Sequence, residues 1–133
     1  MTSDIEELVR AYYRVVGDLS SSESDLSALW HPDATVVEHP NVISPHGAAR
    51  TVAESLAGFR AGKALLSAQT FDVHEVLVDG DRAAVRATWT GTVGVENPRV
   101  PVGTTMVAHV AAFVVVQDGR ILRHETYDCY EPL

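Results

Sequence analysis

Hydrophobic residues recur every three or four positions near the start of the chain, which is the spacing of one face of a helix. They are Ile5, Leu8, Val9, Tyr12, Val15 and Val16. Thr2 or Ser3 can cap the N-terminus of this helix. Glu6 and Glu7 fall in its first turn, where the helix dipole favours acidic side chains. We therefore predict an N-terminal helix that ends at Gly17.

The following segments predict two more helices with a strand between them. Residues 26–30 carry hydrophobic residues at helical spacing, and Pro32 stops this short helix. Residues 34–39 are rich in β-branched side chains and predict a strand that Pro40 closes. Residues 48–66 predict a third helix, because their hydrophobic positions again share one face.

From Thr70 onward the hydrophobic positions alternate with polar ones, which predicts strands. Asp-Gly pairs at 79–80 and 118–119 form tight turns between consecutive strands. The predicted strands cover residues 71–78, 83–95, 104–116 and 121–130. Helices followed by an antiparallel meander are typical of an α+β protein whose helices pack on one face of its sheet. We expect one domain over residues 1–133, since this length suits a single core.

Charge and composition narrow the range of partners. The net charge is −8, so the surface repels phosphate backbones and anionic lipids, and we expect neither nucleic acid nor membrane as a partner. The longest apolar run, residues 107–116, is too short to span a bilayer. Residues 1–7 are acidic and do not resemble a secretory signal, so we expect a cytoplasmic protein. The single cysteine, Cys129, cannot form an internal disulfide.

Several short motifs follow one another in a recognisable order. They are residues 33–40 (DATVVEHP), 80–86 (GDRAAVR), 90–92 (TGT), 101–104 (PVGT) and 118–121 (DGRI). Their order and spacing resemble the nuclear transport factor 2-like superfamily, in particular its SnoaL-like members of the ketosteroid isomerase and polyketide cyclase type. The resemblance implies a cone-shaped, strongly curved antiparallel sheet packed on about three N-terminal helices. It also implies a homodimer formed through the outer face of the sheet.

The resemblance places the candidate catalytic base at His39. In ketosteroid isomerases the base sits just before the proline that ends the first strand, and His39 occupies that position. Histidine suits proton transfer because its ordinary pKa is about 6.5. The alternatives are Glu38 as the base and His39 as a half-exposed residue at a strand end. Neighbouring side chains of a strand point to opposite faces, so only one of the two can point into the cone.

By the same resemblance, one face of the strand at residues 104–116 lines the pocket. This face carries Thr105, Val107, His109, Ala111, Phe113 and Val115. Ala111 falls where the isomerase has a protonated aspartic acid, which argues against a ketosteroid isomerase proper. His109 can supply a polar group instead, with a pKa lowered by burial. The alternative is a core histidine bonded to a neighbouring tyrosine or carboxylate.

The last strand supplies two more candidates. Aligning it on residues 119–121 directs His124 and Asp128 toward the cavity, His124 as a ligand contact and Asp128 as a catalytic group. Related cyclases and epoxide hydrolases have an aspartate on this strand. A shift of one residue would turn Cys129 inward instead. A further alternative pairs Asp128 with an arginine such as Arg86.

Aromatic residues complete the predicted pocket. Tyr12 lies roughly where the isomerase has its oxyanion tyrosine, so its hydroxyl can donate to a ligand carbonyl. The alternative is a core tyrosine bonded to protein. The predicted aromatic walls, or core residues, are Trp30, Phe59, Trp89 and Phe113.

Together these residues predict a cofactor-free enzyme that moves a proton in a small, largely apolar, oxygenated molecule by isomerisation, dehydration or cyclisation. His39 would be the base, with Tyr12, His109 and Asp128 as donors or orienting groups. The alternatives are a non-catalytic ligand-binding or dimerisation module and a vestigial pocket filled by aromatic side chains. The six histidines show no zinc-ligand spacing, so we expect no metal.

Overall fold

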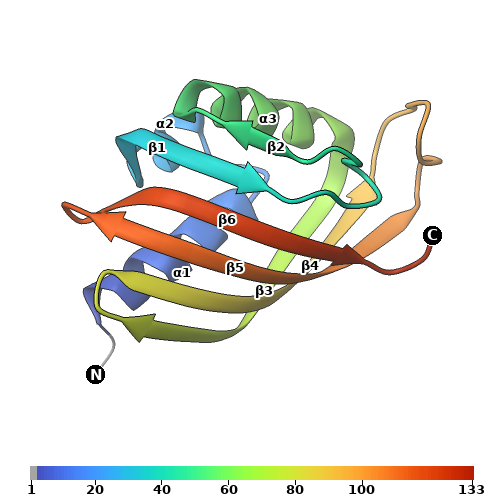
Figure 1. Cartoon of the computed structure of the whole chain (residues 1–133). Helices are drawn as coiled ribbons and strands as arrows, with labels where there is room; N and C mark the ends of the chain where they lie inside the picture. The colour runs from blue at the N-terminus through green and yellow to red at the C-terminus, as the bar shows by residue number, and fades with distance from the viewer. Residues whose placement is uncertain (1–2) are drawn as a thin grey trace.

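The computed structural model describes residues 3–133, which form a curved sheet and its covering helices (Figure 1). The helices are α1 (Asp4–Val16), α2 (Glu23–Ser27) and α3 (Val52–Leu65). The strands are β1 (Trp30–Glu38), β2 (Ala48–Arg50), β3 (Leu66–Asp79), β4 (Arg82–Val93), β5 (Thr105–Gln117) and β6 (Arg120–Tyr130). The predicted α+β class is confirmed.

Helix α1 begins and ends as its sequence predicts. The Ser3 side chain caps it by accepting a hydrogen bond from the Glu6 backbone N–H, and Gly17 closes its C-terminus. Thr2, the other candidate cap, lies outside the described residues. The apolar face of α1 buries Val9 and Tyr12. This burial fixes the helix against the sheet, because a short helix is marginal without tertiary packing.

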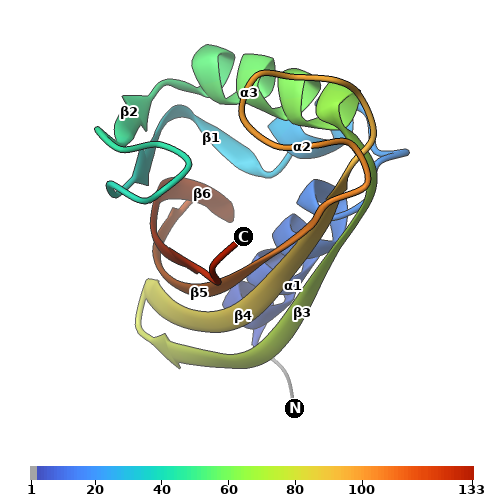
Figure 2. The same ribbon diagram turned by 90° about the vertical axis from the view of Figure 1, so that its right-hand side faces the viewer.

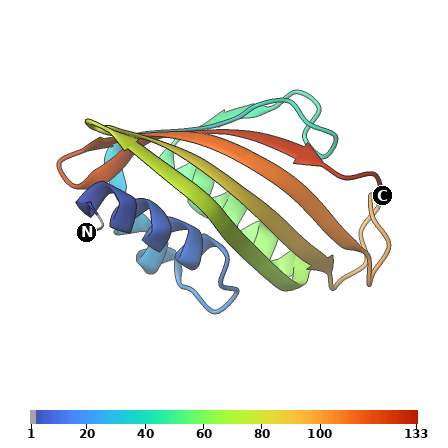
Figure 3. The same cartoon turned by 90° about the horizontal axis from the view of Figure 1, so that it is seen from below.

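The six strands follow the order β2-β1-β6-β5-β4-β3 within the described chain. Strands β3 to β6 form the predicted antiparallel meander. Strand β1, however, pairs with β6 in parallel, so the expectation of a wholly antiparallel sheet is wrong. The sheet curves around α1 and α3, which both lie on its concave side, and it does not close into a barrel (Figures 2 and 3). A parallel neighbour is allowed here because a long crossover containing α3 precedes β6.

The boundary between β2 and α3 differs from the prediction. Residues 48–50 form an edge strand antiparallel to β1, where the sequence predicted the start of a helix. Helix α3 begins only after Thr51, whose side chain accepts from the Glu54 N–H while the Glu54 carboxylate accepts from the Thr51 N–H. This reciprocal capping box sets the start of the helix.

Strand β1 begins earlier than predicted. It includes Trp30, which the sequence placed in the short helix, whereas α2 ends at Ser27. Pro32 falls inside β1, where the register with β6 is interrupted between Trp30 and Thr35. A proline is tolerated at this interruption because no ladder hydrogen bond from its nitrogen is needed.

The core lies between the concave face of the sheet and the helices. Val9 of α1 and Ile121 of β6 are both 0% exposed. From Met106 to Val116 every second residue of β5 is also buried. None of the helices in the described part of the chain is both long and apolar enough to cross a membrane.

Candidate functional site

A cavity opens between the concave face of the sheet and helices α1 and α3. It consists of three adjoining compartments that share Val16 and Glu38 in their walls. The α3 compartment, which Phe59 and Trp30 line, has a volume of about 270 Å³. The Asp128 compartment, between α1 and β6, has about 200 Å³. The Tyr130 compartment, toward the C-terminus, has about 350 Å³.

Asp128 points into the cavity from β6, on the face that the sequence predicted. The Thr126 hydroxyl donates a 2.6 Å hydrogen bond to Asp128 Oδ1, and no other described residue donates to this carboxyl group. Burial raises the pKa of Asp128 above its ordinary value, the Thr126 hydrogen bond opposes this, and the nearby Glu38 adds to it. Arg86 lies instead 3.9 Å from Glu75, so it does not pair with Asp128.

His124 also points inward, from the same face of β6 as Asp128. Its Nε2 lies 2.9 Å from the Tyr13 hydroxyl oxygen, and its Nδ1 is buried without a hydrogen-bond partner among residues 3–133. Burial lowers the pKa of His124 to about 4, so the imidazole is neutral at pH 7. The Tyr12 ring packs edge-on against it, with 4.8 Å between ring centroids. Tyr13 was not singled out from the sequence, so the pair that it forms with His124 was missed.

Two tyrosine hydroxyls remain free to meet a ligand. Tyr12 lines the α3 and Asp128 compartments, and Tyr130 lines the Tyr130 compartment. Neither hydroxyl bonds to a described residue. Burial and the charge of Asp128 raise the pKa of both tyrosines, so both hydroxyls keep their protons and can donate.

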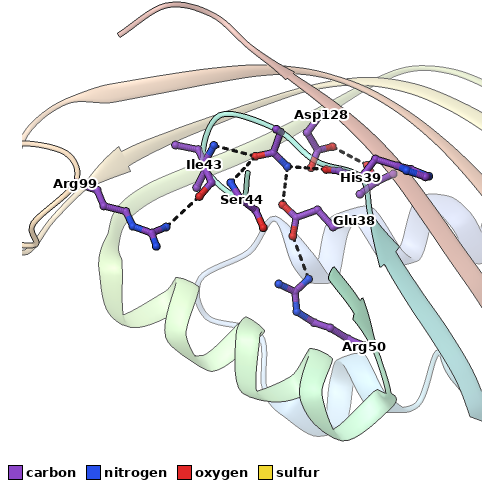
Figure 4. A network of polar contacts seen from close by, with 9 residues as sticks. Glu38, His39, Ile43, Ser44, Arg50, Arg99 and Asp128 are labelled. Atoms are coloured by element: carbon purple, nitrogen blue, oxygen red, sulfur yellow. Dashed lines mark hydrogen bonds and ion pairs between the residues drawn. The ribbon is translucent and has the colours of Figure 1, made fainter. Parts of the chain in front are cut away.

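Glu38 lines all three compartments, and its carboxylate points toward Arg50 (Figure 4). Arg50 Nη1 donates to Glu38 Oε1 at 3.0 Å, and Asn41 Nδ2 donates to Oε2 at 2.9 Å. The Asn41 side chain also accepts from the backbone N–H groups of Ile43 and Ser44, which fixes the loop after β1. Both oxygens of Glu38 therefore have donors, unlike those of Asp128. The sequence named Glu38 only as an alternative to His39 and gave no signal for Arg50, which was read as helical.

His39 lies on the opposite side of β1 from Glu38, so its predicted place in the pocket is wrong (Figure 4). Its Nε2 lies 2.6 Å from Glu125 Oε2, and its ring stacks on Tyr127 with 4.1 Å between centroids. Both partners belong to the outer face of β6. Because neighbouring side chains of a strand point to opposite faces and Glu38 points inward, His39 must point outward.

The predicted pocket face of β5 is wrong by one residue. The buried positions are Met106, Ala108, Val110, Ala112, Val114 and Val116, so the predicted set faces outward. His109 is exposed and its Nε2 lies 2.7 Å from Glu131 Oε2. Phe113 is 52% exposed and packs against Tyr127, and Ala111 is exposed as well. The reason is that apolar residues occupy both faces of β5, so hydrophobicity cannot choose the inner one.

The other predicted aromatic residues lie in the cavity walls. Trp30 and Phe59 line the α3 compartment, and Trp89 lines the Tyr130 compartment. Trp89 Nε1 donates to Gln69 Oε1 at 2.8 Å. Trp30 Nε1 is buried without a partner among the described residues. No group of three or more metal-ligating side chains occurs within residues 3–133.

Chemically, the cavity combines one partly satisfied, desolvated carboxyl group with hydroxyl donors in apolar walls. Such an arrangement can take up and return a proton while a hydroxyl stabilises an oxygen on the same ligand. Arg50 and Glu38 form an ion pair in the cavity wall, so their opposite charges offset one another there.

Solved structures of similar fold include IdmH of Streptomyces antibioticus, provisionally described as a polyketide cyclase. It shares 24% identity, with a TM-score of 0.78, over 95% of this chain and 92% of that one. AclR of Streptomyces galilaeus, provisionally described as a hydroxylase, shares 20% identity, with a TM-score of 0.77, over 97% and 81% of the two chains. An epoxide hydrolase of M. tuberculosis, described as LEH-like, shares 16%, with a TM-score of 0.73, over 96% and 84%. At these identities the likeness shows the fold alone.

The sequence itself carries the family assignment. No curated protein matches it. The model of the SnoaL-like domain matches residues 9–124, which run from within α1 to the cavity-facing His124 within β6. That match covers most of the chain and agrees with the curved α+β architecture, so the chain belongs to the SnoaL-like domain family.

Proposed function

We propose that this chain is an enzyme that transfers a proton within a small, largely apolar, oxygenated molecule, with Asp128 as the proton carrier. The observation that carries the proposal is the environment of Asp128. Its carboxyl group faces the cavity and is desolvated, and among residues 3–133 it accepts only one hydrogen bond, from Thr126. Desolvation raises its pKa, which brings a carboxyl group closer to the range in which it exchanges protons efficiently.

Asp128 and Tyr12 have separate roles in the proposed reaction. The ionised carboxylate of Asp128 removes a proton from a carbon next to a carbonyl group, and the carbonyl oxygen gains negative charge. The Tyr12 hydroxyl donates a hydrogen bond to that oxygen, because its raised pKa keeps it protonated. Asp128 then returns the proton to a second carbon, so the molecule is isomerised without net change in atoms or charge.

The apolar walls support this chemistry by excluding water. Val16, Val36 and Phe71 line the Asp128 compartment beside the polar groups. In a dry site a hydrogen bond to developing charge is stronger than in water. Glu38 is less suited to be the carrier, since both of its oxygens already accept hydrogen bonds from Arg50 and Asn41.

The proposal is tested by hydrogen exchange on enolisable ketones in D₂O. Cyclohex-2-enone, 1-tetralone and a steroid enone are incubated with the chain, and deuterium incorporation is followed by mass spectrometry. The chain is expected to accelerate incorporation into at least one ketone. Asp128→Asn is expected to slow it by about 10²–10⁴-fold, the usual contribution of a general acid or base.

Two variants on the outer face serve as controls. Glu125→Gln makes the same change of carboxylate to amide on the same strand, and His39→Ala removes the base that the sequence predicted. Both are expected to leave exchange unchanged. Exchange that persists in Asp128→Asn, or that is lost in His39→Ala, would contradict the proposed role of Asp128.

A non-catalytic ligand-binding module is the second candidate, because the same apolar walls can hold a ligand without turnover. A thermal-shift measurement separates the two. A ligand at about 100 times its dissociation constant stabilises the folded state by about 2.7 kcal/mol. Stabilisation by the ketones without any exchange would favour the binding module.

A further inference from the structure

Helix α3 contains two glycines, Gly58 and Gly62, that its own packing does not require. A glycine in a helix interior lowers helix stability relative to alanine. A Cβ atom placed on either residue would meet no protein atom within 4 Å. Neither has a positive φ, so neither backbone conformation demands glycine. The fold of the described chain therefore does not require glycine at either position.

The two glycines differ in what they face. Gly58 lies in the wall of both the α3 and the Tyr130 compartments. Gly62, one turn later, lines none of the three compartments. A side chain at position 58 would therefore extend into the space of the cavity, and a side chain at position 62 would not.

The volumes of the α3 and Asp128 compartments indicate that neither one alone holds a typical small-molecule ligand. The α3 compartment holds about 270 Å³ and the Asp128 compartment about 200 Å³. Each is smaller than the roughly 300 Å³ at the lower end of small-molecule pockets. They share the walls formed by Tyr12, Val16 and Val36, so one molecule can extend from one into the other.

The chemistry of the walls gives this molecule a direction. The carboxyl group of Asp128 lies at one end, with the donor Tyr12 between the compartments. The far end of the α3 compartment is formed by Leu26, Trp30 and Phe59, which suit an apolar ring. The reacting oxygen-bearing end thus belongs at Asp128 and the inert ring beneath α3.

We propose that Gly58 is a specificity-determining residue that keeps the α3 compartment open for a ring of the substrate. A side chain at position 58 would accordingly limit the size of the molecule that can extend from Asp128 to beneath α3. This inference rests on the proposed function only in taking the cavity as the substrate site. It does not depend on turnover.

The test measures the binding of three phenols of increasing length to the full chain by isothermal titration calorimetry. The probes are phenol, 2-naphthol and 2-hydroxyanthracene. The unmodified chain is expected to bind the two longer probes more tightly than phenol. Gly58→Leu is expected to weaken 2-naphthol binding by at least about tenfold, since even one added methylene can exclude a ligand to that extent. Phenol, which needs only the Asp128 compartment, is expected to bind Gly58→Leu unchanged.

Gly62→Leu is the matched control, because it places the same side chain on the same helix in equally open space. It is expected to leave all three affinities unchanged, and thermal melting checks that both variants are folded. The inference is overturned if no probe binds the unmodified chain, if Gly58→Leu weakens phenol as much as 2-naphthol, or if Gly62→Leu acts like Gly58→Leu. Failure of the proposed function is recognised separately, by ketone exchange that survives Asp128→Asn while these binding differences persist.

Discussion

The two faces of β6 carry the same kinds of side chain in opposite surroundings. On the inner face Asp128 is desolvated, and burial raises its pKa. On the outer face Glu125 accepts a hydrogen bond from His39, which lowers the pKa of its carboxyl group. Two carboxyl groups three positions apart on one strand are thus shifted in opposite directions. The difference teaches that the face of the strand, rather than the residue type, decides which polar groups can exchange protons with a buried ligand.

The largest expected contrast between the faces is in stability. Ile121→Ala removes a side chain that is 0% exposed and should lower the free energy of unfolding by about 2–5 kcal/mol. Phe113→Ala removes a larger side chain that is 52% exposed on the outer face. Surface substitutions usually change the free energy of unfolding by about 0.5 kcal/mol, so we expect a loss of less than about 1 kcal/mol. Urea unfolding measures both. A loss of unfolding free energy well above this expected value for Phe113→Ala would show that the outer face is covered in solution.

The second contrast concerns pH and the two histidines His124 and His109. Burial lowers the pKa of His124 from 6.5 to about 4 in the folded chain. As the pH falls, the unfolded chain therefore takes up this proton before the folded chain does. The contribution of neutral His124 to the free energy of unfolding is fully present above pH 6.5 and is lost progressively between pH 6.5 and about pH 4. The slope contributed by one such group is about 1.4 kcal/mol per pH unit.

The comparison of unfolding free energies across this pH range isolates the effect. His124→Gln keeps a donor and acceptor near Tyr13 but does not titrate, so its stability should depend less on pH than that of the unmodified chain. His109→Gln makes the same change of residue type on the exposed outer face and serves as the matched control for the substitution itself. Equal pH dependence in the unmodified chain and His124→Gln would mean that His124 is not buried as a neutral group.

The smallest expected contrast is between two tyrosine hydroxyls. Tyr12→Phe removes a hydroxyl that faces the cavity and has no partner among the described residues, so stability should be unchanged while ketone exchange falls by up to about tenfold, the value of one hydrogen bond. Tyr127→Phe removes a hydroxyl on the outer face and should affect neither. Exchange that is unaffected by Tyr12→Phe would assign the oxygen contact to another donor, with Tyr130 as the next candidate.

The sequence predicted most of the fold because local signals and periodicity agreed. The cap at Ser3, the Asp-Gly turns and the alternation of β6 all act over a few residues, and the structure retains them. The parallel pairing of β1 with β6 was not predictable in this way, since it joins distant parts of the chain. The edge strand at residues 48–50 was missed because alanine favours a helix, and pairing with β1 overrides that weak preference.

The site was predicted in part for a related reason. On β6, polar His124 and Asp128 alternate with residues of the outer face, and their inward direction followed from the alignment. On β5, valines and alanines occupy both faces, so the hydrophobic pattern does not show which face is buried. The predicted register was therefore wrong by one residue, and His109 was assigned to the inner face. The contacts of Glu38 with Arg50 and of Tyr13 with His124 depend on tertiary geometry that no local pattern encodes.

The parallel pairing of β1 with β6 also orders the events of folding. His39 and Glu125, which meet across this pair, are separated by 86 positions in the sequence. Contacts between such distant segments form late, because closing a long loop costs entropy before the contact rewards it. During synthesis the residues of the helices and of the hairpin formed by β3 and β4 are made before those of β6. Glu38 and Asp128 are therefore brought to one cavity only by the last strand of the chain, and the site is finished in the same step as the sheet.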